Sequence, residues 1–198
     1  MSQEAQRFFA VMDESISQNG EFLIYVISAA IFKEPRFAVE KVFREFLAQA
    51  QIFKTSYLAD RKRFARIMSA LKWNLKHAEM NISSWDSGNL LNQEMSRQFC
   101  LAKLLVTLQG QGVSRCIMDS RENPNAFDPQ GPNKRDLHTL NYLREELLLS
   151  NRIELIHLRD DQLKLIGCAD LISWVTRKHL LGEESSFWDV VSPKSLLI

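Results

Sequence analysis

The chain has 198 residues, of which 45% are hydrophobic and 25% are charged, a composition typical of one globular domain. Its formal net charge of +1 gives no global field that would mark it as a nucleic-acid binder. No apolar run is long enough to span a membrane, and the three cysteines lack C-x-x-C spacing and fit reduced thiols. We therefore expect one cytoplasmic domain over residues 1–198.

The first part of the chain predicts two strands joined by a tight turn. Phe8–Met12 is a continuous apolar run that ends at Asp13. Asn19-Gly20, the strongest hairpin signal in the sequence, leads to a second run, Glu21–Phe32. Continuous apolar strands are typical of strands covered on both faces, so we expect an antiparallel pair near the centre of a sheet.

Two helices and a strand are expected next. Pro35 suits the first turn of a helix, and a second helical pattern contains Ile67 and Leu71. Around residues 77–83 the apolar period changes to two, which predicts a half-exposed strand.

A long helix follows, capped by Asp86 or Ser87 and ending near Gly110. The residues expected to form its apolar side are Leu91, Met95, Phe99, Leu104, Leu105 and Leu108.

The remaining elements alternate between strand and helix. Val113–Met118 is a short strand that ends on Asp119, followed by a loop over residues 120–133. A helix with an apolar side of Leu137, Leu140, Leu147 and Leu148 leads to an alternating strand, Arg152–Leu158. The last helix is expected to be capped by Asp160 or Asp161 and to run to about Leu181, and residues 183–198 to form a strap without regular elements.

This order predicts an α/β fold with a mixed five-stranded sheet and helices on both faces. With the first strand in the centre, the strand order is 3-2-1-4-5, counted along the chain. Strands three and five then lie at the edges, and right-handed crossovers make strands one and four parallel neighbours.

Three aspartates are expected to meet at the carboxyl edge of this sheet. Asp13 and Asp119 follow two strands predicted to be adjacent and parallel, whose spacing is about 4.8 Å. Asp170 shares one face of the last helix with Ile166 and Trp174, where a lone carboxylate would need a partner. Oxygen ligands of this kind suit Mg²⁺ or Mn²⁺.

Each aspartate has an ordinary interpretation when it is taken singly. An aspartate after a strand is more often a turn former, and Asp170 could be exposed or paired with Arg177. Their joint placement at one edge favours a metal site.

At these residues the chain resembles a bacterial family, domain of unknown function 3800, in the ribonuclease-H-like superfamily. The family has an Asp-Glu pair after its first strand, matched by Asp13-Glu14, and a Gln-x-x-Asp on its last helix, matched at Asp170 with Gly167 in place of the glutamine. The resemblance covers nearly the whole chain and implies a ribonuclease-H-like fold with metal-dependent phosphodiester chemistry. Lys54 resembles a lysine in a short segment after the family's first helix.

The resulting hypothesis is a nuclease or phosphodiesterase that uses two Mg²⁺ or Mn²⁺ ions. Asp13 would bridge the ions, with Asp119 and Asp170 holding one each. Glu14 belongs to the family mark and counts as a catalytic candidate, but strand geometry points it to the opposite face. Lys54 would contact a substrate phosphate, although a lone lysine is more often solvated.

The alternative is an accessory protein that keeps the fold without the chemistry. Gly167, the near-neutral charge and the exposed-looking Phe187 and Trp188 favour it. A third option is an enzyme that acts on small nucleotides. The partners left open are nucleic acid, a second copy of the chain or another protein; no membrane partner is expected.

Overall fold

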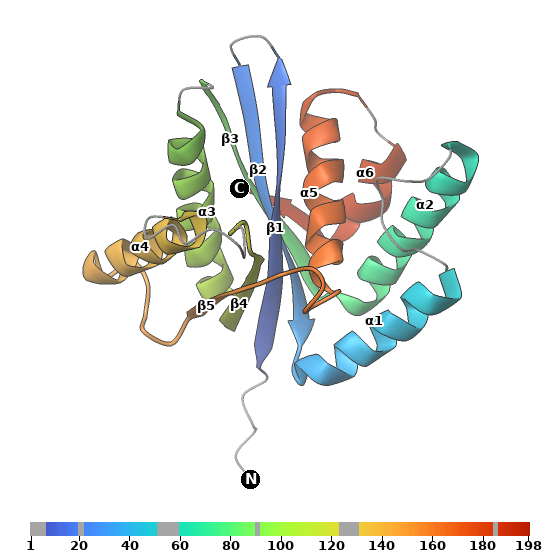
Figure 1. Cartoon of the computed structure of the whole chain (residues 1–198), viewed down its shortest axis with the longest axis horizontal. Coiled ribbons are helices and arrows are strands. Elements are labelled where there is room, and N and C mark those ends of the chain that lie inside the picture. Colours follow the sequence, from blue (N-terminus) through green and yellow to red (C-terminus); the bar gives the residue numbers. More distant parts are fainter. Residues whose placement is uncertain (1–6, 20–21, 51–59, 90–91, 123–130, 184–185) are drawn as a thin grey trace.

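A computed structural model shows an α/β fold built on one six-stranded mixed sheet (Figure 1). It describes residues 7–19, 22–50, 60–89, 92–122, 131–183 and 186–198. The strands are β1 Phe8–Asn19, β2 Phe22–Lys33, β3 Met80–Asn89, β4 Val113–Asp119, β5 Glu154–Leu158 and β6 Ser195–Leu197. The helices are α1 Arg36–Ala50, α2 Asp60–His77, α3 Gln93–Gly110, α4 Pro132–Glu145, α5 Ile166–Leu180 and α6 Ser186–Val191.

The strand order is β5-β4-β1-β2-β3-β6, which confirms the predicted order and adds one strand. β1 pairs antiparallel with β2 and parallel with β4, as expected for a central first strand. The sheet is therefore compatible with a ribonuclease-H-like fold.

The hairpin of β1 and β2 is longer than predicted. β1 continues past Asp13 to Asn19, because every residue of that extension has a partner on β2, ending with Asn19 opposite Phe22. The prediction that β1 ends at Met12 was therefore wrong for this pairing. It is right for the pairing with β4, whose last partners are Met12 and Met118.

Helices cover both faces of the sheet, as predicted (Figure 1). α3 and α4 lie over one face, called here the α3 face. α1, α2, α5 and α6 lie on the other side, called the α5 face. Each face has its own apolar core, with Met12 of β1 packed on the α3 face and Val11 on the α5 face. Successive residues of β1 therefore meet different environments.

β3 is longer and more buried than predicted. Asp86 and Ser87 lie in β3 and are not helix caps, and α3 begins only at Gln93. The prediction that this strand is half exposed and lies at the edge of the sheet was also wrong. Asn81–Ser84 are buried, and β6 pairs with Asn81–Ser83. The length of β3 follows from its pairing with β2 up to Asn89, and its buried part is next to the tail strand β6.

α3 presents a different side to the core than the apolar pattern indicated. Met95 and Phe99 are exposed, whereas Arg97 is fully buried. The buried residues of the helix are Ser96, Arg97, Cys100, Leu101, Leu104, Leu105 and Leu108. Arginine is almost never fully buried without a partner, and the partners of Arg97 lie on other elements. The pattern of apolar residues along α3 therefore could not predict which side of the helix faces the core.

The C-terminal tail forms regular structure, contrary to the prediction of a strap without elements. It contains α6, a short 3-10 helix at Ser192–Lys194, and β6. Phe187 is buried and its ring lies 5.0 Å from that of Phe64, while Trp188 stacks on His179. The exposed aromatics that favoured an accessory role are therefore packed against the domain.

Two smaller expectations were also wrong. α4 ends at Glu145, and Leu147 and Leu148 are exposed instead of lining its core side. α5 is preceded by Leu165, so neither Asp160 nor Asp161 caps it. None of the helices in the described ranges has the length and apolar character needed to cross a membrane.

Candidate functional site

The structure places Asp13 and Asp119 side by side on the α5 face. The parallel ladder of β1 and β4 ends with Met12 opposite Met118, and the two aspartates are the next residue on each strand. Val11, two residues before Asp13, packs in the core under α5, so the alternation of the strand directs Asp13 to the same side. Asp119 is oriented in the same way by Ile117.

Asp170 approaches this pair from α5. Its neighbours Ile166 and Ala169 are buried in the core between α5 and the sheet, which sets the height of the helix above β1. The negative charge of Asp170 raises the pKa of Asp13, after burial the largest cause of that shift. Asp13, Asp119 and Asp170 are called here the acidic site.

The Asp13 carboxyl is the most perturbed group of this site. Burial first, then the charges of Asp170 and Asp119, raise its pKa to about 8. Burial also raises the pKa of Asp119 and of Asp170. At neutral pH the site therefore favours taking up positive charge, either as a proton on Asp13 or as a cation.

Sequence reasoning missed Asp160, which had been interpreted as a helix cap. It lies in the turn after β5, and its backbone N–H donates a hydrogen bond to the Asp119 carboxylate. Its charge contributes to the raised pKa of all three members of the acidic site, after burial in each case. The strand-ending pattern that pointed to Asp119 applies to Asp160 as well, since it follows β5 by two residues.

Ser28 is a second residue whose position only the structure shows. It lies opposite Asp13 on β2 and is fully buried. Its hydroxyl is 2.6 Å from that of Ser83 on β3, which is 3.1 Å from the Thr176 hydroxyl on α5. These hydroxyls join the sheet to α5 beside the acidic site.

The acidic site has no basic partner within the described part of the chain. Ion pairs there join basic side chains to other acids. The hydrogen bond to the Asp13 side chain comes from the backbone N–H of Glu14 at 2.7 Å. As the side chains stand, no three His, Cys, Asp or Glu residues among those described are arranged to hold a metal ion.

Glu14 lies on the α3 face, where it forms ion pairs with two arginines. One is the buried Arg97 and the other is Arg121, at 3.4 Å. Strand alternation thus separates the two members of the Asp13-Glu14 pair. The proposed catalytic role of Glu14 stays a prediction, but its side chain does not share the side of Asp13.

Arg97 is the centre of a buried polar network on the α3 face. Its Nε and Nη2 donate to the two carboxylate oxygens of Asp136 at 2.8 and 2.6 Å, a bidentate pair. The Tyr25 hydroxyl accepts from Nη1 at 3.0 Å, and His157 Nε2 lies 2.9 Å from Asp136. These residues, with Glu14 and Arg121, are called here the arginine network.

The pKa of Asp136 moves opposite to that of Asp13. Burial alone would raise it, but hydrogen bonds from His157 and Arg97 and the arginine charge outweigh burial and hold the pKa of Asp136 below its usual value. The sequence carried no signal for this network, because its members are distant along the chain and unremarkable singly.

Two other candidates have different outcomes. Lys54 lies outside the described residues, so its role stays a prediction. Gly167 is exposed, and a Cβ added to it would meet no atom within 4 Å. A side chain would therefore fit at the position where the resembling family has a glutamine.

No protein-family model matches the chain, and no curated protein matches it in sequence. The resemblance to domain of unknown function 3800 thus rests on the motif residues quoted above, and the sheet order is compatible with a ribonuclease-H-like fold.

Proposed function

We propose that the chain is a divalent-cation-dependent phosphodiesterase or nuclease in which Asp13, Asp119 and Asp170 hold Mg²⁺ or Mn²⁺. One observation carries the proposal: a largely buried carboxylate, with a pKa of about 8, faces two further carboxylates and no ion-paired cation among the described residues. Such a site gains stability when a cation enters it. Its location at the carboxyl edge of the central parallel strands is where open α/β sheets bind ligands.

Cation binding requires rearrangement of these side chains. Since no ready three-residue metal site is present in the described parts of the chain, the carboxylates would have to rotate about their backbone positions. Asp13 would lose its proton as the cation enters. The backbone ladder and the hydroxyls beneath α5 keep the three positions close during that change.

The residues have distinct roles in this proposal. A bound divalent ion would supply positive charge to a phosphodiester and lower the pKa of a bound water. Asp13 would be the central ligand, because its strand β1 pairs with β4, which carries Asp119, and packs against α5, which carries Asp170. Asp160 would add negative charge beside Asp119 and strengthen the attraction for the cation.

Calorimetry with Mn²⁺ tests the binding step. We expect wild-type protein to bind Mn²⁺ and Asp13→Asn to lose binding. Asp161→Asn is the matched control, because Asp161 is an exposed acid next to Asp160 that pairs with Arg159 at 2.5 Å. If wild-type protein binds no divalent ion, the enzyme proposal is wrong.

Cleavage assays test the reaction. Single- and double-stranded DNA and RNA, together with short nucleotide phosphodiesters, are incubated with protein and Mn²⁺. Cleavage that Asp119→Asn abolishes, while this variant keeps the wild-type circular dichroism spectrum, would support the proposal. The substrates cleaved would separate polymer from small-nucleotide activity.

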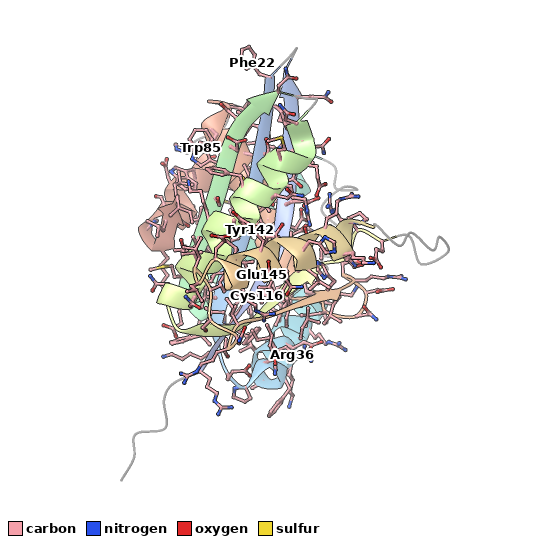
Figure 2. All side chains as sticks on the ribbon, turned by 90° about the vertical axis from the view of Figure 1, so that its left-hand side faces the viewer. Phe22, Arg36, Trp85, Cys116, Tyr142 and Glu145 are labelled. Atoms are coloured by element: carbon pink, nitrogen blue, oxygen red, sulfur yellow. The ribbon has the colours of Figure 1, made fainter. Side chains whose placement is uncertain are left out.

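The second candidate function is an accessory or interaction protein without catalysis. It is favoured by the lack of a ready metal site among the described residues and by exposed apolar side chains. Phe22 at the end of the β1–β2 hairpin and Tyr142 on α4 are two of them (Figure 2). Mn²⁺ binding without cleavage of any substrate would favour this function.

A further inference from the structure

We infer that Arg97 is a positioning residue for the acidic site: from the opposite face of the sheet, it holds together the positions on β1 and β4 that carry Asp13 and Asp119. The expected effect of Arg97 on metal affinity rests on the proposed function. Its expected effect on the position of the two aspartates does not, and can be measured on the metal-free protein.

The contacts of Arg97 reach both strands next to the aspartates. Its guanidinium forms an ion pair with Glu14, the residue after Asp13 on β1. Its Nη2 lies 3.7 Å from the sulfur of Met118, the residue before Asp119 on β4. One side chain thus contacts the immediate chain neighbours of both site residues.

A second arginine strengthens the same link. Arg121 follows Asp119 by two residues, and its Nη1 lies 3.4 Å from Glu14 Oε1. Glu14 is therefore held from α3 and from the segment after β4 simultaneously. The opposite end of the network is anchored by Asp136 on α4, which binds Arg97 through both oxygens and also contacts His157 on β5.

The backbone ladder of β1 and β4 ends one residue before both aspartates. The parallel ladder between β1 and β4 has its last pair at Met12 and Met118, so the next residues have no ladder partner across that junction. Beyond this point β1 is paired to β2 alone. Beyond the last ladder pair, the ion pairs of Glu14 with Arg97 and Arg121 on the α3 face add a link between the two aspartate-bearing positions.

A purely structural role would not need this chemistry. Burying a guanidinium and two carboxylates is offset only when every group is paired, and an apolar cluster of similar volume is often as stable. The bidentate geometry fixes direction as well as distance. Groups that orient metal ligands in this way typically change metal affinity by about 10–100-fold when they are removed.

The test compares two network variants with a matched core variant. Arg97→Lys keeps the charge and loses the bidentate geometry, while Glu14→Gln cuts the link to β1 and leaves Arg97 with Asp136. Leu101→Ala is the control, because Leu101 is fully buried one turn further along α3 in the same core and is outside the network.

Two measurements are made on each protein. Amide hydrogen exchange of residues 13–15 and 118–120 is recorded without metal and corrected for global stability. Mn²⁺ affinity is measured by calorimetry. We expect both network variants to exchange at least about tenfold faster at these amides than Leu101→Ala and to bind Mn²⁺ about tenfold more weakly than wild type. Leu101→Ala should bind within about twofold of wild type.

The outcomes separate the inference from the proposed function. If wild-type protein binds no Mn²⁺, the proposed function is wrong, and faster exchange in the network variants alone would still support the positioning role. Equal exchange in network and control variants would overturn the inference. So would wild-type Mn²⁺ affinity in Arg97→Lys, because charge without bidentate geometry would then be sufficient.

Discussion

Asp13 and Glu14 are consecutive residues of β1, yet they meet opposite electrostatic environments. On the α5 face, Asp13 faces other carboxylates and forms no ion pair among the described residues. On the α3 face, Glu14 is paired with the buried Arg97 and with Arg121. Successive side chains of a strand point to opposite faces of the sheet, so neighbouring carboxylates differ: Asp13 has no ion pair among the described residues, and Glu14 has two.

The difference shows that burial alone does not decide the state of an acid. Burial acts to raise the pKa of both Asp13 and Asp136. Beside other acids the pKa of Asp13 rises to about 8, whereas hydrogen bonds and the charge of Arg97 bring that of Asp136 below its usual value. Ion-paired acids on the α3 face hold elements of the fold together, whereas acids without an ion pair on the α5 face favour uptake of a cation.

The largest effect on stability is expected from removing the positive charge of Arg97 on the α3 face. Arg97→Met leaves Glu14 and Asp136 without their buried partner and should lower the free energy of unfolding by about 3–5 kcal/mol. Arg115→Met removes a half-exposed arginine that pairs with Glu154 at 3.3 Å, and should cost less than about 1 kcal/mol. Urea denaturation measures both. Similar losses of unfolding free energy in Arg97→Met and Arg115→Met would contradict the expectation that the buried arginine stabilises the fold more than the half-exposed one.

The pH dependence of stability should differ in sign between the faces. The Asp13 carboxyl keeps its proton to about pH 8 in the folded chain but loses it near pH 4 when unfolded, so the folded state binds more protons in between. Its contribution to the free energy of unfolding is full below pH 4 and is lost as pH rises to about 8, at up to about 1.4 kcal/mol per pH unit.

Asp13→Asn should therefore flatten the stability profile between pH 5 and pH 8 and be more stable than wild type at pH 8. Asp136 behaves oppositely: its pKa is lowered, so its contribution is present above its usual pKa and is lost as pH falls below it. Asp136→Asn should be less stable than wild type at pH 7 and lose less stability in acid. Urea titrations from acid, below the usual pKa of an aspartate, up to about pH 8 measure both slopes. An unchanged slope between pH 5 and pH 8 in Asp13→Asn would refute the assignment.

A smaller effect is expected at Asp160, the exposed fourth carboxylate. Asp160→Asn removes a charge that repels the acidic site, so the metal-free protein should gain about 0.5 kcal/mol of stability. If Mn²⁺ binds, the same change should weaken binding several-fold without abolishing it. Thermal unfolding with and without Mn²⁺ measures both effects. Complete loss of binding would instead make Asp160 a direct ligand.

The smallest effect is expected at Gly167, beside Asp170 in the first turn of α5. Gly167→Ala places a Cβ in open space and should raise stability by a few tenths of a kcal/mol, at most about 1, through helix propensity. Gly167→Gln should fold equally well for the same reason. A loss of more than about 1 kcal/mol of unfolding free energy in either variant would show that another part of the chain lies too close to Gly167 for a side chain to fit.

The local sequence pattern was sufficient to predict an element where apolar residues continue along a buried strand. The apolar runs before Asp13 and Asp119 predicted adjacent parallel strands, and the structure confirms the strand order. The phase of α3 was not predictable in this way, because its core side contains Arg97 and its exposed side contains Phe99. Which apolar residues are exposed depends on partners that other elements supply.

The sequence by itself determined the central hairpin, the strand order and the two strands that bear Asp13 and Asp119, because buried strands and turns have local signatures. The tertiary structure alone decided which acids are paired. Arg97 reaches Glu14 and Asp136 from distant parts of the chain, while the buried part of β3 is covered by the tail strand β6. Pairing of buried charges depends on distances between elements, and those distances exist only after the elements have packed.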